Sequence, residues 1–306
     1  MTGAAADLPE VGRASRPQMV CLDLDGTTID YSSVLHPPVR DAVRATSAAG
    51  HTVVVATGRT LRATLPLARE LGLRDAYLVC SNGAVLLRID PAADEGYELL
   101  EVVTFDPAPA LELLRQHLPG AYVAAEVIGV GHRIIEGFPE EALQGELTLA
   151  TWEELGSEPV TRLTFHDPGS TEEEFLEALD RIGLHGVNWS VGYTAWLDLT
   201  PEGVSKASGL EQVRRALGVE PCDTVAVGDQ RNDLEMLDWA ARGVAMGQAP
   251  DEVKAAADEV TGTVEEHGLA QLLRTLEGVE AALPVVARQT PDAATEHDAS
   301  ATPGPV

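Results

Sequence analysis

Three aspartates stand where apolar segments of the chain end. Asp23 and Asp25 lie within the apolar run 19–26, and Asp229 closes the segment 223–229. Carboxylates at positions i and i+2 of an extended strand point to the same side, so one can attack an electrophile while the other moves protons. A third carboxylate facing them is electrostatically costly without a hard cation, and oxygen ligands favour Mg²⁺. The spacing therefore predicts carboxylate chemistry beside a magnesium ion.

Further polar residues close or follow other segments of this kind. Thr57 and Gly58 end the run 51–58 and offer a hydroxyl and an unhindered backbone N–H at an expected helix start, which suits an anion. Lys206 is one of two lysines and opens an expected helix. Taken alone, a lysine is usually solvated, and residues such as Asn232 and Asp233 at a helix start usually serve as N-caps.

The elements that must position these residues alternate along the chain. The pattern predicts buried strands over 19–26, 51–58, 76–84 and 223–229, and helices over 39–50, 61–72, 205–218 and 233–243. Alternating strands and helices predict an α/β fold with a doubly wound parallel sheet. In such a sheet the ligand crevice lies at the carboxyl ends of the strands, where the polar residues above fall.

The middle of the chain has a different pattern. Strand-like alternation over 162–167 and 187–199 flanks a helical pattern over 171–183, which predicts an inserted α+β domain. The predicted boundaries are 18–87 and 198–280 for the core domain and 88–197 for the insertion. The ends, 1–17 and 281–306, lack periodicity and are predicted to be disordered tails.

Charge and composition restrict the partners. With 21 basic and 49 acidic residues the formal net charge is −28, which disfavours nucleic acids and anionic membranes. Cys21, Cys80 and Cys222 form no CxxC pair and are predicted to be reduced, buried thiols. The beginning of the chain has no signal-peptide pattern and no stretch predicts a membrane span, so we expect a cytoplasmic protein. No feature indicates a particular oligomeric state.

Five segments in this order resemble the haloacid dehalogenase-like superfamily. They are DLDGT at 23–27, ATGR at 56–59, SNGA at 81–84, the Lys206 segment and GDQRND at 228–233. The middle insertion resembles the cap of Cof-type phosphatases, the C2-capped subfamily IIB. The resemblance extends over about 18–280, and it implies a Rossmann-like core with an inserted C2-type cap.

The resemblance also implies roles for individual residues. Asp23 would be the nucleophile and Asp25 the general acid/base. The phosphoryl group would be held by Thr57, Gly58, Lys206 and Asn232. Magnesium would be held by the Asp23 carboxylate, the Asp25 main-chain carbonyl and the Asp229 carboxylate, with Asp233 as a weaker ligand. Arg59 and Asn82 would border the crevice as possible substrate contacts.

These residues predict magnesium-dependent hydrolysis of small phosphorylated metabolites through an aspartyl-phosphate. Two alternatives stay open, namely a phosphomutase or phosphotransferase of the same superfamily and a receiver-like phospho-acceptor module. No GxxxxGK(S/T), GxGxxG, HExxH or GxSxG motif is present, which argues against the sites that those motifs build. His132 and His166 in the middle region could meet a substrate, but roles as surface or packing residues are favoured.

Overall fold

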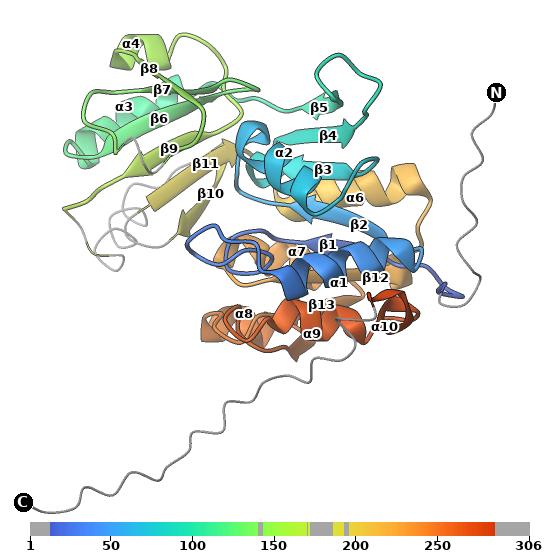
Figure 1. Ribbon diagram of the computed structural model, residues 1–306. Helices are drawn as coiled ribbons and strands as arrows, with labels where there is room; N and C mark the ends of the chain where they lie inside the picture. Colours follow the sequence, from blue (N-terminus) through green and yellow to red (C-terminus); the bar gives the residue numbers. More distant parts are fainter. Residues whose placement is uncertain (1–12, 140–142, 170, 172–185, 193–195, 285–306) are drawn as a thin grey trace, which may run out of the picture.

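The computed structural model describes residues 13–139, 143–169, 171, 186–192 and 196–284. Within these residues the chain forms one eight-stranded and one six-stranded sheet. The larger sheet and its helices form the core, and the smaller sheet forms a cap at one end of it (Figure 1). Apart from residue 171, the helix predicted over 171–183 lies outside the described residues.

The core sheet has the strand order β14-β13-β12-β1-β2-β3-β4-β5, and its first six strands are mutually parallel. The last two strands, β4 and β5, are antiparallel additions at one edge. The strands are β1 (Met19–Leu22), β2 (Thr52–Ala56), β3 (Tyr77–Cys80), β4 (Val85–Ile89), β5 (Tyr97–Val102), β12 (Thr224–Gly228), β13 (Arg242–Ala245) and β14 (Glu259–Val260).

Helices cover both faces of this sheet, and alternate side chains of the central strand β1 pack against the two helix layers. Val20 and Leu22 of β1 pack with one helix layer, whereas Met19 and Cys21 pack with the other. The first layer contains α1 (Pro37–Ala48), α2 (Leu61–Glu70), α9 (Gly268–Arg274) and α10 (Val279–Ala282), and the second contains α6 (Lys206–Leu217), α7 (Leu234–Trp239) and α8 (Asp251–Ala256). The predicted doubly wound α/β fold is confirmed. None of the described helices is long and apolar enough to cross a membrane.

The cap sheet has the order β10-β11-β9-β6-β7-β8, and all its pairs are antiparallel except β7 with β8. Its strands are β6 (Tyr122–Val127), β7 (Gly131–Ile134), β8 (Glu146–Leu149), β9 (Leu163–His166), β10 (Val187–Gly192) and β11 (Trp196–Pro201). Helix α3 (Ala108–His117) packs on one face through Leu111 and Leu114, and the short α4 (Trp152–Leu155) adds Leu155 to the same cluster.

The other face of the cap sheet carries polar side chains. Leu163 and Phe165 of β9 belong to the cluster under α3, so Arg162 and Thr164 point away from that helix. Leu197 and Leu199 of β11 do the same, which places the side chain of Asp198 on the polar face beside Thr164. Strand alternation alone therefore gathers the polar groups on the face away from α3.

The predicted boundary between core and cap was wrong by about fifteen residues on one side. The pairs β3–β4 and β4–β5 extend the core sheet to Val102, so residues 88–102 belong to the core rather than to the insertion. β5 is an edge strand with exposed Leu99 and Leu100, and so it lacks the apolar alternation that would have marked it. At the other end, β11 continues to Pro201 instead of stopping at residue 197.

Three smaller predictions also need correction. The helix predicted over 233–243 ends at Trp239, and β13 begins at Arg242. Gly243, predicted as the end of the helix, lies within β13, where a side chain would collide with the backbone of Leu237. The core reaches beyond the predicted tail boundaries. The N–H of Ala14 donates to a core carbonyl, and Leu283 is buried.

Cys21 and Cys80 are buried as expected, but Cys222 is exposed. Cys222 lies in the turn before β12 rather than in the strand itself. Burial raises the pKa of the Cys80 thiol to about 12.

Candidate active site

Three buried carboxylates form a cluster at the carboxyl ends of β1 and β12. Asp23 follows β1, Asp229 follows β12, and Asp233 ends the short 3-10 turn η4 (Arg231–Asp233). The N–H of Asp23 donates to the carbonyl of Val227 at 3.0 Å, which continues the ladder between the two strands. One oxygen from each acid lies within 4.8 Å of the others.

The ammonium group of Lys206 opposes two of these acids. Lys206 is 1% exposed, and its Nζ donates to Asp23 Oδ1 at 2.6 Å and to Asp233 Oδ1 at 2.7 Å. Burial alone would lower the pKa of Lys206, but the two carboxylates outweigh it and raise the pKa above its usual value. Burial raises the pKa of Asp23 well above its ordinary value, although Lys206 opposes the rise.

Helix α6 and the turn η1 (Ser81–Gly83) fix the position of Lys206. The side chain of Ser205 caps α6, which makes Lys206 the first residue of the helix. Gly83 has φ of +105°, and a side chain there would collide with the main chain of Ser205. The turn and the helix start are therefore in backbone contact, directly before the lysine.

Asp229 has one oxygen bound and one oxygen without a partner. Its Oδ2 accepts from the hydroxyl of Tyr31 at 2.6 Å and from Gln230 Nε2 at 3.0 Å. Its Oδ1 is buried and has no hydrogen-bond partner in the described part of the chain. Burial, with Asp233 adding to it, raises the pKa of Asp229 to about 6.

The acid cluster fits a divalent cation bound by oxygen. In the part of the chain that the structure describes, three buried carboxylates face one ammonium group, so the cluster carries excess negative charge that burial makes costly. The unpartnered Oδ1 of Asp229 is available as a ligand, and a hard cation prefers oxygen ligands of this kind.

Asp233 is used mainly for structure. Its Oδ1 binds Lys206, and its Oδ2 accepts from the N–H groups of Asp229 at 2.9 Å and Gln230 at 3.0 Å. One carboxylate thus holds both the lysine and the loop that carries Asp229. Both oxygens of Asp233 are therefore already engaged in hydrogen bonds.

Three of the predicted phosphate-binding residues, Thr57, Gly58 and Asn232, lie around Asn82, which was predicted as a possible substrate contact. The N–H of Asn82 donates to the carbonyl of Thr57 at 3.0 Å, and Asn232 Nδ2 donates to Asn82 Oδ1 at 3.0 Å. A side chain at Gly58 would lie 3.2 Å from Asn82, so the glycine makes room for that amide. Asn82 Nδ2 is buried and has no partner among the described residues, which leaves a donor for a ligand.

Helix α2 begins at Leu61, as predicted, but Thr57 and Gly58 are not its first residues. Thr60 is the N-cap of α2, so Thr57 and Gly58 lie in the turn before the helix rather than at its start. The Thr57 N–H is also occupied, because it donates to Val79 at 2.8 Å. The hydroxyl of Thr57 accepts from the N–H of Arg59 at 3.1 Å.

Asp25 is held by an arginine. Arg59 donates from Nε to Asp25 Oδ2 at 2.8 Å and from Nη2 to Asp25 Oδ1 at 2.5 Å, a two-point ion pair. The side chain of Asp25 is 46% exposed, whereas Asp23 is buried. Arg59, predicted only to border the crevice, is thus the residue that orients Asp25.

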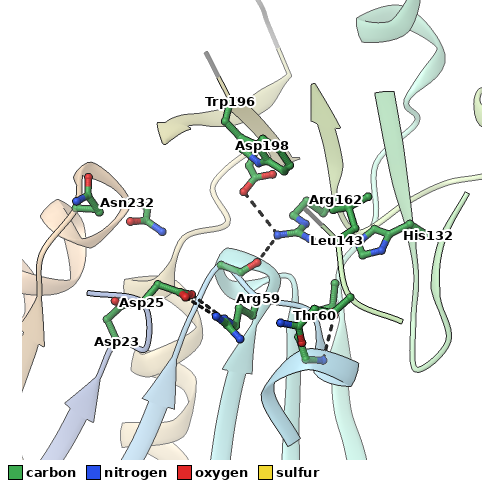
Figure 2. A pocket seen from close by; sticks show the side chains of 14 residues that line it. Asp23, Asp25, Arg59, Thr60, His132, Leu143, Arg162, Trp196, Asp198 and Asn232 are labelled. Carbon is green, nitrogen blue, oxygen red and sulfur yellow. Dashed lines mark hydrogen bonds and ion pairs between the residues drawn. The ribbon is translucent and has the colours of Figure 1, made fainter. Parts of the chain in front are cut away.

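Asp23 and Asp25 line a pocket of about 340 Å³ between core and cap. Figure 2 shows Asp23 and Asp25 at its core side and Arg162, Asp198 and Trp196 on the cap side. The pocket is lined by Asp23, Asp25, Gly58, Arg59, Thr60, Ala63, His132, Leu143, Gln144, Arg162, Trp196, Asp198, Gln230 and Asn232.

A family model described as haloacid dehalogenase-like hydrolase matches residues 20–273. The chain belongs to this family. The match includes the acid cluster, Lys206 and the whole cap, so the predicted superfamily is confirmed.

Relatives and solved structures give the same assignment. The pyridoxal phosphate phosphatase YbhA of Escherichia coli is 28% identical over 84% of this chain and 97% of its own length. The 5-amino-6-(5-phospho-D-ribitylamino)uracil phosphatase YcsE of Bacillus subtilis is also 28% identical, over 84% of this chain and 94% of its own length. Among solved structures, the subclass IIB sugar phosphatase BT4131 is 25% identical with a TM-score of 0.71, covering 86% of this chain and 99% of that protein. The predicted enzyme class, a phosphatase of the haloacid dehalogenase type, is confirmed.

The sequence analysis missed Arg162, Trp196 and Asp198, which line the cap side of the pocket. Arg162 is 8% exposed and donates from Nη1 to the carbonyl of Gly58, with Asp198 Oδ2 at 3.6 Å. His132, expected to be a surface or packing residue, lies in the pocket wall, and its Nε2 is 3.4 Å from Arg162 Nη2. Burial, assisted by the charge of Arg162, lowers the pKa of His132 to about 3.

A second contact joins cap and core beside the pocket. Glu126 of β6 is buried, and its Oε2 accepts from the hydroxyl of Ser81 at 2.6 Å and of Thr161 at 3.0 Å. Ser81 and Asn82 both have positive φ, of 52° and 54°. A cap carboxylate therefore holds the strained turn that carries Asn82.

Proposed function

We propose that this protein is a magnesium-dependent phosphatase that hydrolyses small phosphate monoesters through a phosphorylated Asp23. The observation that carries the proposal is the buried contact of Lys206 with Asp23 inside a cluster of carboxylates at the floor of the pocket. Relatives of similar length are named as phosphatases of pyridoxal phosphate and of a phosphorylated ribityl compound. Their names support a small organic monoester as the substrate.

The cation ligands in this proposal are the carboxylates of Asp23 and Asp229 and the main-chain carbonyl of Asp25, with Asp233 contributing weakly. When bound, Mg²⁺ would supply charge neutralisation for the phosphoryl oxygens. The unpartnered Oδ1 of Asp229 and the excess of carboxylates over ammonium groups support this ligand set.

In the first step a carboxylate oxygen of Asp23 attacks phosphorus, and the bond from phosphorus to the ester oxygen breaks. Asp25 donates a proton to the departing oxygen, so an alcohol leaves. Lys206, the Thr57 hydroxyl and the free amide N–H of Asn82 are the donors that stabilise charge on the phosphoryl group.

In the second step water attacks the phosphorus of phospho-Asp23, and Asp25 takes the proton of that water. The bond between phosphorus and the Asp23 oxygen breaks, which regenerates the carboxylate and releases inorganic phosphate. Arg59 keeps Asp25 at the pocket wall in both steps through its two-point ion pair. Two easier displacements thus replace one difficult hydrolysis.

The test is phosphate release from a panel of phosphorylated metabolites, with Mg²⁺ and without any added acceptor. We expect release from at least one monoester, loss of release after chelation, and recovery on adding Mg²⁺. Phosphate release that needs an added alcohol or sugar acceptor would instead identify a phosphotransferase or mutase. Full activity in excess chelator would contradict the metal requirement.

A further inference from the structure

The charges around the pocket are already paired. Among the described residues, its lining contains three carboxylates, Asp23, Asp25 and Asp198, and two guanidinium groups, Arg59 and Arg162. Arg59 is bound by Asp25 at two points, and Arg162 has Asp198 at 3.6 Å. Beyond the phosphoryl site, the described lining therefore offers no unopposed cation to a second anionic group on the substrate.

The cap end of the pocket is nevertheless polar. Arg162 is more than nine-tenths buried, and its Nε has no hydrogen-bond partner among the described residues. The same holds for Nδ1 of His132, which is 2% exposed. Because the pKa of His132 is lowered to about 3, the ring is uncharged at neutral pH. Buried polar atoms without a partner are costly, and these two belong to side chains that line the pocket.

Asp198 supplies an acceptor at the same end. Its Oδ1 accepts from the hydroxyl of Thr164 at 2.7 Å, and its side chain is 14% exposed. Beside it, Trp196 lines the pocket and is held by Phe138, with ring centres 5.7 Å apart in an edge-on contact. A carboxylate here can accept hydrogen bonds from hydroxyl groups and repels an anion.

We infer that the cap end binds an uncharged leaving group that carries hydroxyls, with Asp198 and Arg162 as its specificity determinants. Substrates whose leaving group carries a carboxylate or a second phosphate are disfavoured, since that charge would face Asp198 with no free cation. The inference rests on the proposed phosphatase function and adds the charge and polarity of the group that the enzyme releases.

A matched pair of substrates tests it on the intact enzyme with Mg²⁺. D-Glucitol 6-phosphate and 6-phospho-D-gluconate share an open six-carbon chain and differ at C1, which is a hydroxymethyl group in one and a carboxylate in the other. We expect kcat/KM to be at least about tenfold higher for the glucitol ester. The same order should hold for their potency as inhibitors of p-nitrophenyl phosphate hydrolysis.

Asp198→Asn is the informative variant, because it removes the charge and keeps the shape. We expect the ratio between the two substrates to fall to within about threefold. Glu153→Gln removes one charge from an exposed position of α4 and should leave the ratio unchanged. Melting temperatures of both variants verify that they are folded.

The outcomes separate the inference from the proposed function. A ratio below threefold for the unmodified enzyme, in hydrolysis or in inhibition, overturns the inference while phosphate release from p-nitrophenyl phosphate keeps the phosphatase proposal. An unchanged ratio in folded Asp198→Asn overturns the role of Asp198. Absence of phosphate release from every ester, p-nitrophenyl phosphate included, overturns the proposed function and the inference with it.

Discussion

Core and cap contribute polar side chains to one pocket, but they hold them differently. On the core side, Lys206, Asp233 and Asp25 have each charged group paired at hydrogen-bonding distance. On the cap side, Arg162 and His132 keep buried polar atoms without partners. The core also has unpartnered atoms, Asp229 Oδ1 and Asn82 Nδ2, but they lie beside the paired charges that would hold a cation and a phosphoryl group, whereas those of the cap lie away from that charged cluster.

The largest effect should come from the core. Asp23→Asn removes the nucleophile but keeps the shape of the side chain, so we expect phosphate release to fall by about 10⁴–10⁶-fold. No phosphoenzyme should form in a single turnover. Asp238→Asn, an acid of α7 that does not line the pocket, serves as the control and should retain full activity. Substantial turnover in Asp23→Asn would place the nucleophile elsewhere.

A smaller loss is expected when the acid/base is removed. Asp25→Ala should slow phosphorylation of Asp23 by about 10²–10⁴-fold for alkyl monoesters, whose leaving oxygen needs a proton. The loss should be mild for p-nitrophenyl phosphate, and the phosphoenzyme should persist longer. Rapid-quench single turnovers measure both. If both substrates slow equally and no phosphoenzyme accumulates, Asp25 only supports the loop.

The contact between the two regions can be broken at Glu126. Glu126→Ala leaves the hydroxyls of Ser81 and Thr161 without their acceptor, which should lower the free energy of unfolding by about 1–3 kcal/mol and reduce kcat/KM. Glu126→Gln keeps an acceptor oxygen and should lose far less. We expect KM to rise more than kcat falls, since the turn that presents Asn82 is loosened. Equal losses in both variants would contradict this role.

The smallest expected effect concerns pH and the cap. The pKa of His132 is about 3 in the folded protein and about 6.5 in an unfolded chain. Between these values the unfolded state binds more protons, so stability is complete above about pH 6.5 and falls as the pH drops toward 3. His132→Gln should flatten the fall in melting temperature between pH 6.5 and 4.5. His117→Gln, at an exposed position of α3, should not.

The comparison also explains what the sequence revealed. Residues at strand ends, such as Asp23, Thr57 and Asp229, could be found because a parallel sheet brings strand ends together whatever the loops do. Their neighbours in the chain also carry the family motifs. The spacing of residues along the sequence therefore predicted which residues lie on the core side of the site. It did not predict the ion pairs of Asp25 with Arg59 and of Lys206 with Asp233.

The cap side depends on register between strands distant in sequence. Arg162 and Thr164 alternate with Leu163 and Phe165, so the sequence does carry the signal that they share a face. It does not say that Asp198 pairs beside Thr164. The boundary at residue 88 failed for a related reason, because an exposed edge strand such as β5 has no buried face to produce a pattern.

Gly83 brings no functional group to the site, yet it sets a separation within it. Its missing side chain lets the turn that carries Asn82 rest directly on the main chain of Ser205, one residue before Lys206. The absence of a side chain at Gly83 therefore allows close contact between the turn that carries Asn82 and the start of α6. A larger residue would push Ser205 away from the turn and increase the distance between Lys206 and Asp23. The missing Cβ of Gly83 therefore sets the position of the lysine relative to the proposed nucleophile.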